Sequence, residues 1–461
     1  MSENSAGENA EHGEHGDFEE MLKAVLGEDA AGQIMEHMRE SGIDLNDGMV
    51  HMLNPGNFGQ IITQVQSMLS SSDEGVNWEI GEQVARDGAT HGGSDVLSAA
   101  DAERVRTSLQ TASLWLDPVT DLDPITANVQ AWSRSDYVTH CLPAFRTLTE
   151  PVGENVARAF KEAISQQFDD MPQDIFANLG ASTTQMIEAM ISSLLGVQYG
   201  SGLAELSTVS FGASDSGLLL GDGNTCALVP ANIADFAEGI DDGKDEVELF
   251  AAVREQAAAR LYAQVPWLRP QILDAVAAYS RQIEIDMTSI EEQVRSLDFT
   301  MNTPQEIDLS EVFETEANET QKAMLGQLEH LLSLVEGWVS TVCLDAVIAH
   351  LPHAVALSEL FQRRNATVSP ANRTFGSLVG LELAPRRIRE AAAFWRMATA
   401  KLGAQERDNL WTHPDLLPTP EHLSAPETFF EVPSNPVADE LDAFLAQVLD
   451  EADENKGSDE L

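Results

Sequence analysis

Residues 254–258, Arg-Glu-Gln-Ala-Ala, place a glutamate beside the first of two positions that are four residues apart. Residues four apart lie on one face of a helix, so histidines at both positions would present two ring nitrogens to one zinc ion. The glutamate would then polarise a zinc-bound water, whose pKa falls from roughly 15.7 to about 7. Arg254 and Ala258 occupy those two positions, and neither side chain can bind a metal. Taken alone, the stretch predicts an ordinary alanine-rich helix.

Other common catalytic and cofactor motifs are weak or missing from the sequence. It contains neither a phosphate-binding Gly-x-x-x-x-Gly-Lys-Ser/Thr loop nor a Gly-x-Ser-x-Gly nucleophile elbow, and Gly221-Asp-Gly223 lacks the third glycine of a dinucleotide site. His350 and His353 are close in sequence, but the proline between them predicts a helix end more strongly than a metal site. The chemistry of this chain must therefore be sought around Glu255.

The elements that would position Glu255 are mainly helices. Apolar periodicity predicts helices over Pro151–Gln167, Ala181–Leu195, Glu246–Ala263, Pro270–Ile283, Thr320–Ala349 and Pro385–Leu402. In the helix that carries Glu255, the apolar stripe of Val253, Ala257 and Leu261 is expected to face the core. Two short apolar runs, 217–221 and 226–230, predict a small hairpin. The expected fold class is mainly α with at most a small β element.

The composition along the chain predicts four parts. Residues 1–17 are polar and acidic and predict a disordered N-terminus, and 18–69 show helical spacing typical of a small helical lobe. The main body is expected over 77–433. Residues 434–461 form an acidic tail with one short amphipathic helix, whose apolar face comprises Val437, Leu441, Phe444, Leu445 and Val448. This helix could dock on a partner or fold back on its own body, and the second is favoured.

The formal net charge is −50, from 26 basic and 76 acidic residues. So negative a surface repels phosphate backbones and anionic leaflets, which excludes nucleic acid and membrane as partners. The charge is explained either by solubility and salt adaptation or by attraction of a basic partner or of cations.

The number of cysteines and the length of the apolar runs indicate the cellular compartment of the protein. Cys141, Cys226 and Cys343 are odd in number and widely spaced, which suits a reducing cytoplasm. No secretory signal is visible at the N-terminus, and the longest near-apolar run, 186–197, is too short to span a bilayer. We therefore expect a cytoplasmic protein.

Several longer motifs carry a family resemblance. Val265-Pro-Trp-Leu268 follows the Glu255 stretch, and Leu334-Val-Glu-Gly-Trp-Val339 and the run 411–418, Trp-Thr-His-Pro-Asp-Leu-Leu-Pro, come later; 227–236 and 378–383 add to the pattern. Together these motifs resemble the actinobacterial zincin-like family, whose members are labelled hydrolases or zinc-dependent metalloproteases. The similarity spans roughly 178–430 and implies a zincin-like helical metallopeptidase scaffold.

The resemblance assigns roles residue by residue. One branch of the family carries His-Glu-x-x-His before Val-Pro-Trp-Leu, and Glu-Gly-His further on. By that pattern Glu255 matches the general-base glutamate, and Glu336 matches a downstream glutamate that is a candidate third metal ligand. Arg254 and Ala258 stand at two histidine positions and Trp338 at a third, so this chain resembles the branch with Glu-Gly-Trp, in which the zinc pattern is eroded.

Three functions remain open from the sequence. The first is a catalytically degenerate zincin-like protein without a cofactor, in which a cation such as Arg254 neutralises both glutamates and the old substrate cleft binds a protein or peptide partner. The second is an active hydrolase that holds zinc or another metal through Glu255, Glu336 and His330 or His350. The third is an acidic scaffold whose tails bind partners while its body is inert.

Overall fold

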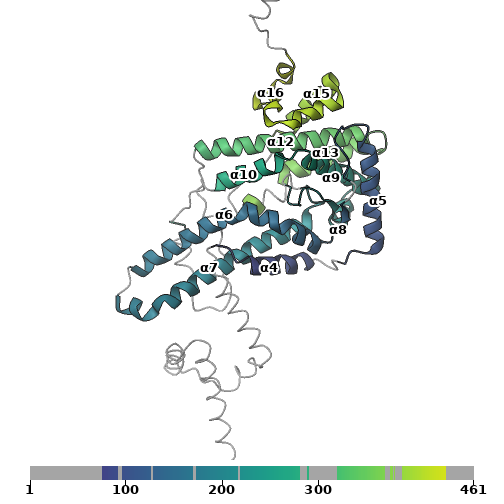
Figure 1. Ribbon diagram of the computed structural model, residues 1–461. Coiled ribbons are helices and arrows are strands. Elements are labelled where there is room, and N and C mark those ends of the chain that lie inside the picture. Colours follow the sequence, from purple (N-terminus) through teal and green to yellow (C-terminus); the bar gives the residue numbers. More distant parts are fainter. Residues whose placement is uncertain are drawn as a thin grey trace, which may run out of the picture. The chain divides into compact units, whose positions relative to one another are not determined.

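The computed structural model describes residues 75–91, 96–125, 128–169, 173–215, 219–280, 288–289, 319–368, 374–376, 378 and 387–431. The predictions for 1–17, 18–69 and 434–461 lie outside these residues. Within them the fold is mainly α, as predicted (Figure 1). Its helices are α4 (Trp78–Thr90), α5 (Ala99–Leu116), α6 (Arg134–Asp169), α7 (Gln173–Val209), α8 (Pro230–Glu238), α9 (Val247–Gln264), α10 (Leu268–Ser280), α12 (Glu319–Val347), α13 (Ala354–Val368), α15 (Ile388–Asn409) and α16 (Pro420–Ser424).

Helix α9 lies at the centre of the body. It packs against α5, α8, α12 and α13, and every residue from Phe250 to Tyr262 is buried. The predicted stripe of Val253, Ala257 and Leu261 is in the core, as expected, and the residues on the other faces of the helix are buried as well. Small alanine side chains let neighbours approach all round. As a result, the polar side chains of α9 must find partners inside the protein.

The hairpin predicted over 217–221 and 226–230 is not formed. Residues 226–228 make a strand, β2 (Cys226–Leu228), but its partner is β1 (Val129–Ala131), and the two strands run parallel with Val129 opposite Cys226. Residues 219–221 are not in a strand, and Leu228 makes only an isolated antiparallel bridge with Gly212. Every side chain of β2 is buried, as expected of a parallel strand that is covered on both faces.

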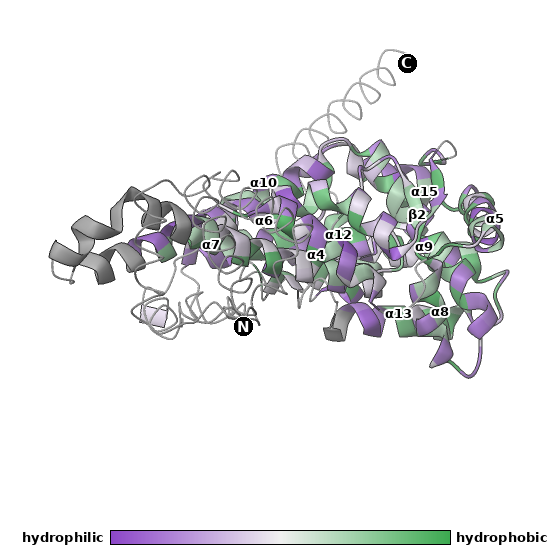
Figure 2. Cartoon of the chain, turned by 90° about the horizontal axis from the view of Figure 1, so that it is seen from below, coloured by the Kyte–Doolittle hydropathy of each residue, from purple (hydrophilic) through white to green (hydrophobic). Residues whose placement is uncertain are grey.

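The observed helix boundaries differ most from the predicted ones where a proline was taken as the first residue of a helix. Helix α6 begins at Arg134 and continues through Pro143 and Pro151, although the sequence predicted a start at Pro151. Buried side chains on both sides of that proline, such as Phe145 and Val156, hold the helix in place. Figure 2 shows hydrophilic and hydrophobic residues interspersed along α5 and α6. Tertiary burial here outweighs the local preference of proline.

Helix α12 is the only helix of the described residues that is long and apolar enough to cross a membrane, and 83% of its most apolar window is buried within the fold. It ends at Val347, and α13 begins at Ala354, so the predicted helix end at His350–His353 is confirmed. The two imidazoles are engaged separately there. His350 stacks on Trp115 with ring centroids 4.4 Å apart, and His353 bonds through Nδ1 to Glu246 at 2.7 Å.

A buried ion pair near the end of α15 ties three segments together. Arg407 donates from Nε and Nη2 to the Asp408 carboxylate at 2.8 and 2.9 Å, and both side chains are almost fully buried. Asp408 also accepts hydrogen bonds from Thr120 Oγ1 at 2.7 Å and Asp121 N at 2.9 Å, in the loop after α5. Trp338 Nε1 of α12 donates to Asp408 Oδ1 at 2.9 Å. One carboxylate thus joins α15, α12 and this loop.

Replacement of Asp408 with alanine should strongly destabilise the protein. The change leaves the Arg407 guanidinium buried without a counter-charge, which costs about 3–5 kcal/mol of the free energy of unfolding. Urea unfolding followed by circular dichroism measures the loss. Asp415→Ala is the control, because the Asp415 side chain is 89% exposed, and it should change the value by less than about 0.5 kcal/mol. Equal effects of the two variants would contradict this role of Asp408.

Candidate functional site

Helices α9, α12 and α13 line a small cavity together with residues 211–215, which follow α7. The space open to the centre of a water molecule is about 20 Å³, enough for about one water. Its polar lining comes from Ser214, Asp215, Arg254, Glu255 and Glu336. Its apolar lining comes from Phe211, Leu228, Ala251, Ala258, Val339 and Phe361. The cavity is therefore a polar pocket set into the hydrophobic core.

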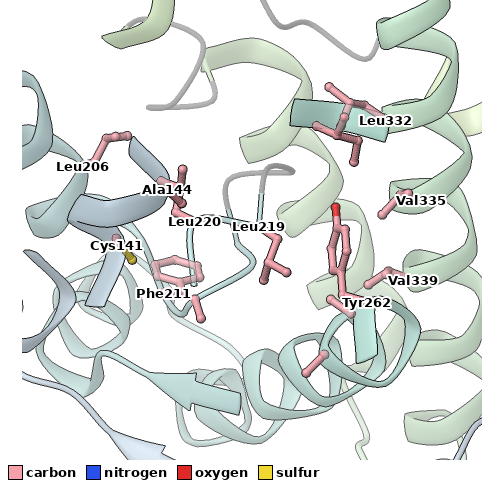
Figure 3. Close-up of a cluster of buried hydrophobic side chains, with 14 of the residues drawn as sticks. Cys141, Ala144, Leu206, Phe211, Leu219, Leu220, Tyr262, Leu332, Val335 and Val339 are labelled. Atoms are coloured by element: carbon pink, nitrogen blue, oxygen red, sulfur yellow. The ribbon is translucent and has the colours of Figure 1, made fainter. Parts of the chain in front are cut away.

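The apolar surroundings of the cavity are well packed. Figure 3 shows Val335 and Val339 of α12 facing the ring of Tyr262 on α9, with Leu219 beside it. Phe211 packs against Phe361 with ring centroids 5.5 Å apart, and Phe361 packs against Phe250 at 4.8 Å. These contacts surround the polar groups with apolar side chains, and the lower local dielectric strengthens electrostatic interactions among them.

The structure brings together four of the five positions that the sequence singled out. Arg254, Glu255 and Ala258 reach the cavity from α9, and Glu336 reaches it from α12. Trp338 does not line the cavity. Two residues along a helix correspond to about 200° of rotation, so Trp338 points to the other side of α12, where its Nε1 bonds to Asp408.

Arg254 and Glu336 form a buried ion pair. Arg254 Nη2 donates to Glu336 Oε1, and each side chain is only 9% exposed. Asn365 Nδ2 donates to the same carboxylate oxygen at 2.8 Å, and Arg254 Nη1 reaches Ser340 Oγ at 3.3 Å. Burial acts to lower the pKa of Arg254, but the charge of Glu336 opposes it and the net pKa is raised. Arg254 is therefore a permanent cation in this cavity.

Glu255 is held by hydrogen bonds alone. Ser214 donates to Glu255 Oε2 from Oγ at 2.6 Å and from N at 3.2 Å, and Ala227 N approaches Oε1 at 3.5 Å. Burial raises the pKa of Glu255 from 4.5 to about 7, and the hydrogen bonds from Ser214 and Ala227 only partly offset this. Arg254 makes no ion pair with Glu255. The expectation that one cation neutralises both glutamates is thus correct for Glu336 and wrong for Glu255.

The carboxylate of Glu255 fits only because residue 212 is a glycine. A Cβ atom at Gly212 would lie 2.6 Å from Glu255 Oε2 and 2.4 Å from the carbonyl oxygen of Ala227. Both separations are shorter than van der Waals contact, so a larger residue would displace the segment that carries Ser214. Gly212 therefore sets how closely this segment approaches α9.

A second ion pair beside the cavity was not predicted from the sequence. Arg364 of α13 donates to both carboxylate oxygens of Asp215, at 3.0 and 2.8 Å, and its guanidinium carbon lies 3.8 Å from the ring centroid of Phe211. The two residues are 149 positions apart, and nothing in the local sequence marks either of them. Three carboxylates, those of Asp215, Glu255 and Glu336, thus face two arginines. Glu255 is the one left without a cation, which agrees with its raised pKa.

The residues at this site do not fit zinc. Ala258 supplies no ligand atom, and the carboxylate of Glu336 is already paired with Arg254. Among the described residues, no group of three or more His, Cys, Asp or Glu side chains could hold a metal ion. The histidines considered as substitutes lie elsewhere. His330 Nε2 is 2.8 Å from the carbonyl oxygen of Pro418, and His350 stacks on Trp115.

One comparison with known proteins identifies a family, and another identifies a solved structure with a similar fold. A family profile described as zincin-like metallopeptidase matches residues 76–430. The crystal structure of a candidate hydrolase with a novel fold from Chloroflexus aurantiacus aligns with a TM-score of 0.52 at 19% identity, over 77% of this chain and 97% of that one. At this identity the structural match shows a shared fold. No curated protein matches the chain.

The raised pKa of Glu255 predicts a specific pH dependence of stability. The unfolded chain ionises near pH 4.5, whereas the folded chain keeps the proton up to about pH 7. The stability that this proton provides is complete below pH 4.5 and is lost as the pH rises to about 7, a loss of about 3 kcal/mol. Glu255→Gln mimics the protonated acid and should not show this loss.

The measurement is the free energy of unfolding of wild type and Glu255→Gln at several pH values between 4 and 8. The difference between them should grow by about 3 kcal/mol in favour of the variant from pH 4.5 to 7. Glu238→Gln, at an exposed position on α8, should follow the wild type throughout. A constant difference between wild type and Glu255→Gln would show that Glu255 ionises normally in the folded protein.

Proposed function

The chain belongs to the zincin-like metallopeptidase family, and we propose that it keeps the family's scaffold without zinc catalysis and acts as a binding or regulatory protein. In this proposal it represents the actinobacterial branch with Glu336-Gly-Trp338, and Arg254 and Ala258 stand where other members carry histidines. The observation that carries the proposal is the buried ion pair between Arg254 and Glu336.

The ion pair of Arg254 and Glu336 disfavours binding of a metal ion in this cavity for electrostatic reasons. A guanidinium fixed on Glu336 already neutralises the carboxylate, so a divalent cation entering the same cavity would gain little attraction from it. The cation would also be repelled by Arg254 at close range in a medium of low dielectric constant. The alternative of a hydrolase with other ligands draws no support from His330 or His350, because neither lines the cavity.

The remaining features support binding of a protein or peptide in a reducing compartment. The cavity holds only about one water, so a partner would contact its surroundings and not fill it. Cys141, Cys226 and Cys343 are free and buried, which suits the proposed cytoplasmic location. No cofactor is part of this proposal.

Metal analysis of the purified protein tests the loss of zinc directly. After expression with added zinc, inductively coupled plasma mass spectrometry should find well below one zinc per chain, because no complete ligand set exists. The same preparation should cleave a fluorogenic peptide library no faster than Glu255→Gln. Near-stoichiometric zinc that disappears in Glu336→Gln would overturn the proposal and support an active metal-dependent hydrolase.

A rebuilt site provides the positive control. Arg254→His together with Ala258→His would place two imidazoles and Glu336 around one cavity, the His₂Glu set of catalytic zinc sites. This double variant should bind zinc at about one ion per chain. Adding Glu336→Gln should weaken the binding. Trp338 needs no change, because its side chain points away from the cavity.

Partner capture separates a binding body from an inert scaffold with binding tails. Cross-linked partners captured by the full chain and by a chain lacking Val437–Leu461 are compared by quantitative mass spectrometry. If the body binds, the same partners should be recovered with both, because the family match ends at residue 430. Loss of all partners on deletion would favour the acidic scaffold instead.

A further inference from the structure

Basic residues are concentrated in one part of this acidic chain. Residues 363–407 contain nine of the 26 lysines and arginines, but only three of the 76 acidic residues. A chain with a net charge of −50 thus has one segment of opposite sign. Of the nine, Arg373 and Arg386 lie outside the described residues.

Most of the described basic residues in this segment point outward. Arg364 and Arg407 are directed inward, to Asp215 and Asp408. The others lie on the surface of α13 and α15 and are Arg363, Arg387, Arg389, Arg396 and Lys401. We call these five residues the basic surface.

Carboxylates engage only part of the basic surface, and one of them, Glu390, pairs with Arg387. Glu359 is shared, since it lies 3.0 Å from Arg363 and 3.4 Å from Arg389, and the side chain of Arg389 is 75% exposed. Within the described part of the chain, no carboxylate lies within 4.0 Å of Arg396 or Lys401. Arg396 acts only at longer range, on the half-buried Asp345. The basic surface therefore has cationic groups available for an anionic segment.

The end of the described chain lies on α15. Phe429 and Phe430 pack against Phe394 with ring centroids 5.0 and 5.7 Å apart. Lys401 Nζ lies 4.9 Å from the ring centroid of Phe430. Five further residues span at most about 17 Å, so the residues that follow 436 begin within reach of Lys401 and of Leu402, which is 40% exposed.

The segment that follows is strongly acidic. Residues 434–461 contain nine acidic residues and one lysine, and their apolar residues recur on one helical face. We propose that residues 434–461 dock in cis on the basic surface, with carboxylates facing Arg389, Arg396 and Lys401 and the apolar face covering Leu402.

The net charge of the protein favours binding of residues 434–461 to the basic surface over binding of a separate acidic molecule. An independent anionic molecule must first approach a protein of charge −50, and that long-range repulsion lowers its affinity and association rate. A covalently attached segment is already at an effective concentration on the order of millimolar, so weak surface ion pairs suffice to hold it.

Zero-length carbodiimide cross-linking of the full chain at low concentration tests the docking. The reagent joins a lysine amine to a carboxylate in direct contact, so peptides that join Lys401 to carboxylates of residues 439–454 should be found by mass spectrometry. Lys322 of α12, 59% exposed, is the control lysine and should give no such product. The yield at Lys401 should fall steeply with added salt.

Charge reversal makes the test specific. Arg389→Glu with Arg396→Glu should lower the Lys401 yield about tenfold, whereas Arg106→Glu on α5, at a side chain 47% exposed, should leave it unchanged. An equal mixture of ¹⁵N-labelled and unlabelled chains distinguishes the occupants. Cross-linked peptide pairs in which both peptides carry the same isotope support docking in cis. Pairs that combine a labelled with an unlabelled peptide would assign the segment to a second copy. Absence of a Lys401 product, or no response to Arg389→Glu with Arg396→Glu, would overturn the proposal.

Discussion

The central constraint on this structure is that the guanidinium of Arg254 is buried and cannot lose its proton. The guanidinium lines a small polar pocket and its side chain is only 9% exposed, so its charge must be compensated within the protein, and Glu336 on the facing helix provides this compensation. The pairing fixes the relative position of α9 and α12. Arg364 is likewise engaged by Asp215, and Glu255, which is buried without a cation, holds its proton up to about pH 7 because burial raises its pKa.

Other buried polar side chains of α9 also need partners inside the protein, and they find them on a different side of the helix. Arg260 donates to the carbonyl oxygen of Ser113 at 2.8 Å and to Asp117 at 2.7 Å, which links α9 to the end of α5. Gln256 reaches the carbonyl oxygen of Leu109 at 3.3 Å. One helix thus presents a charged cavity on one side and a structural polar network on another. A functional assignment for Glu255 must therefore rest on its cavity, because burial and hydrogen bonding are general properties of this helix.

Local sequence was a good guide to the helices and to the residues that meet at the cavity. The spacing of 254, 255 and 258 determines a shared helix face, and the motif around Glu336 supplied the second helix. What sequence could not supply was contact across long separations. Asp215 and Arg364 meet only because α7 and α13 fold together, and β1 pairs with β2 across the long α6–α7 connection. Trp338 aligns with a histidine position of the family motif but lies on the other side of α12 from the cavity, because a short motif does not specify which side of its helix each residue occupies.

The ion pair of Arg254 and Glu336 also constrains how this family member can evolve. Loss of either partner alone leaves the other as an uncompensated buried charge, at a cost of about 3–5 kcal/mol, which is a large fraction of the stability of a typical domain. A single substitution at either position therefore destabilises the fold, independently of any effect on binding. The stability of the fold therefore depends on the residue at position 254, and an uncharged side chain there is tolerated only if Glu336 also changes or pairs with another cation.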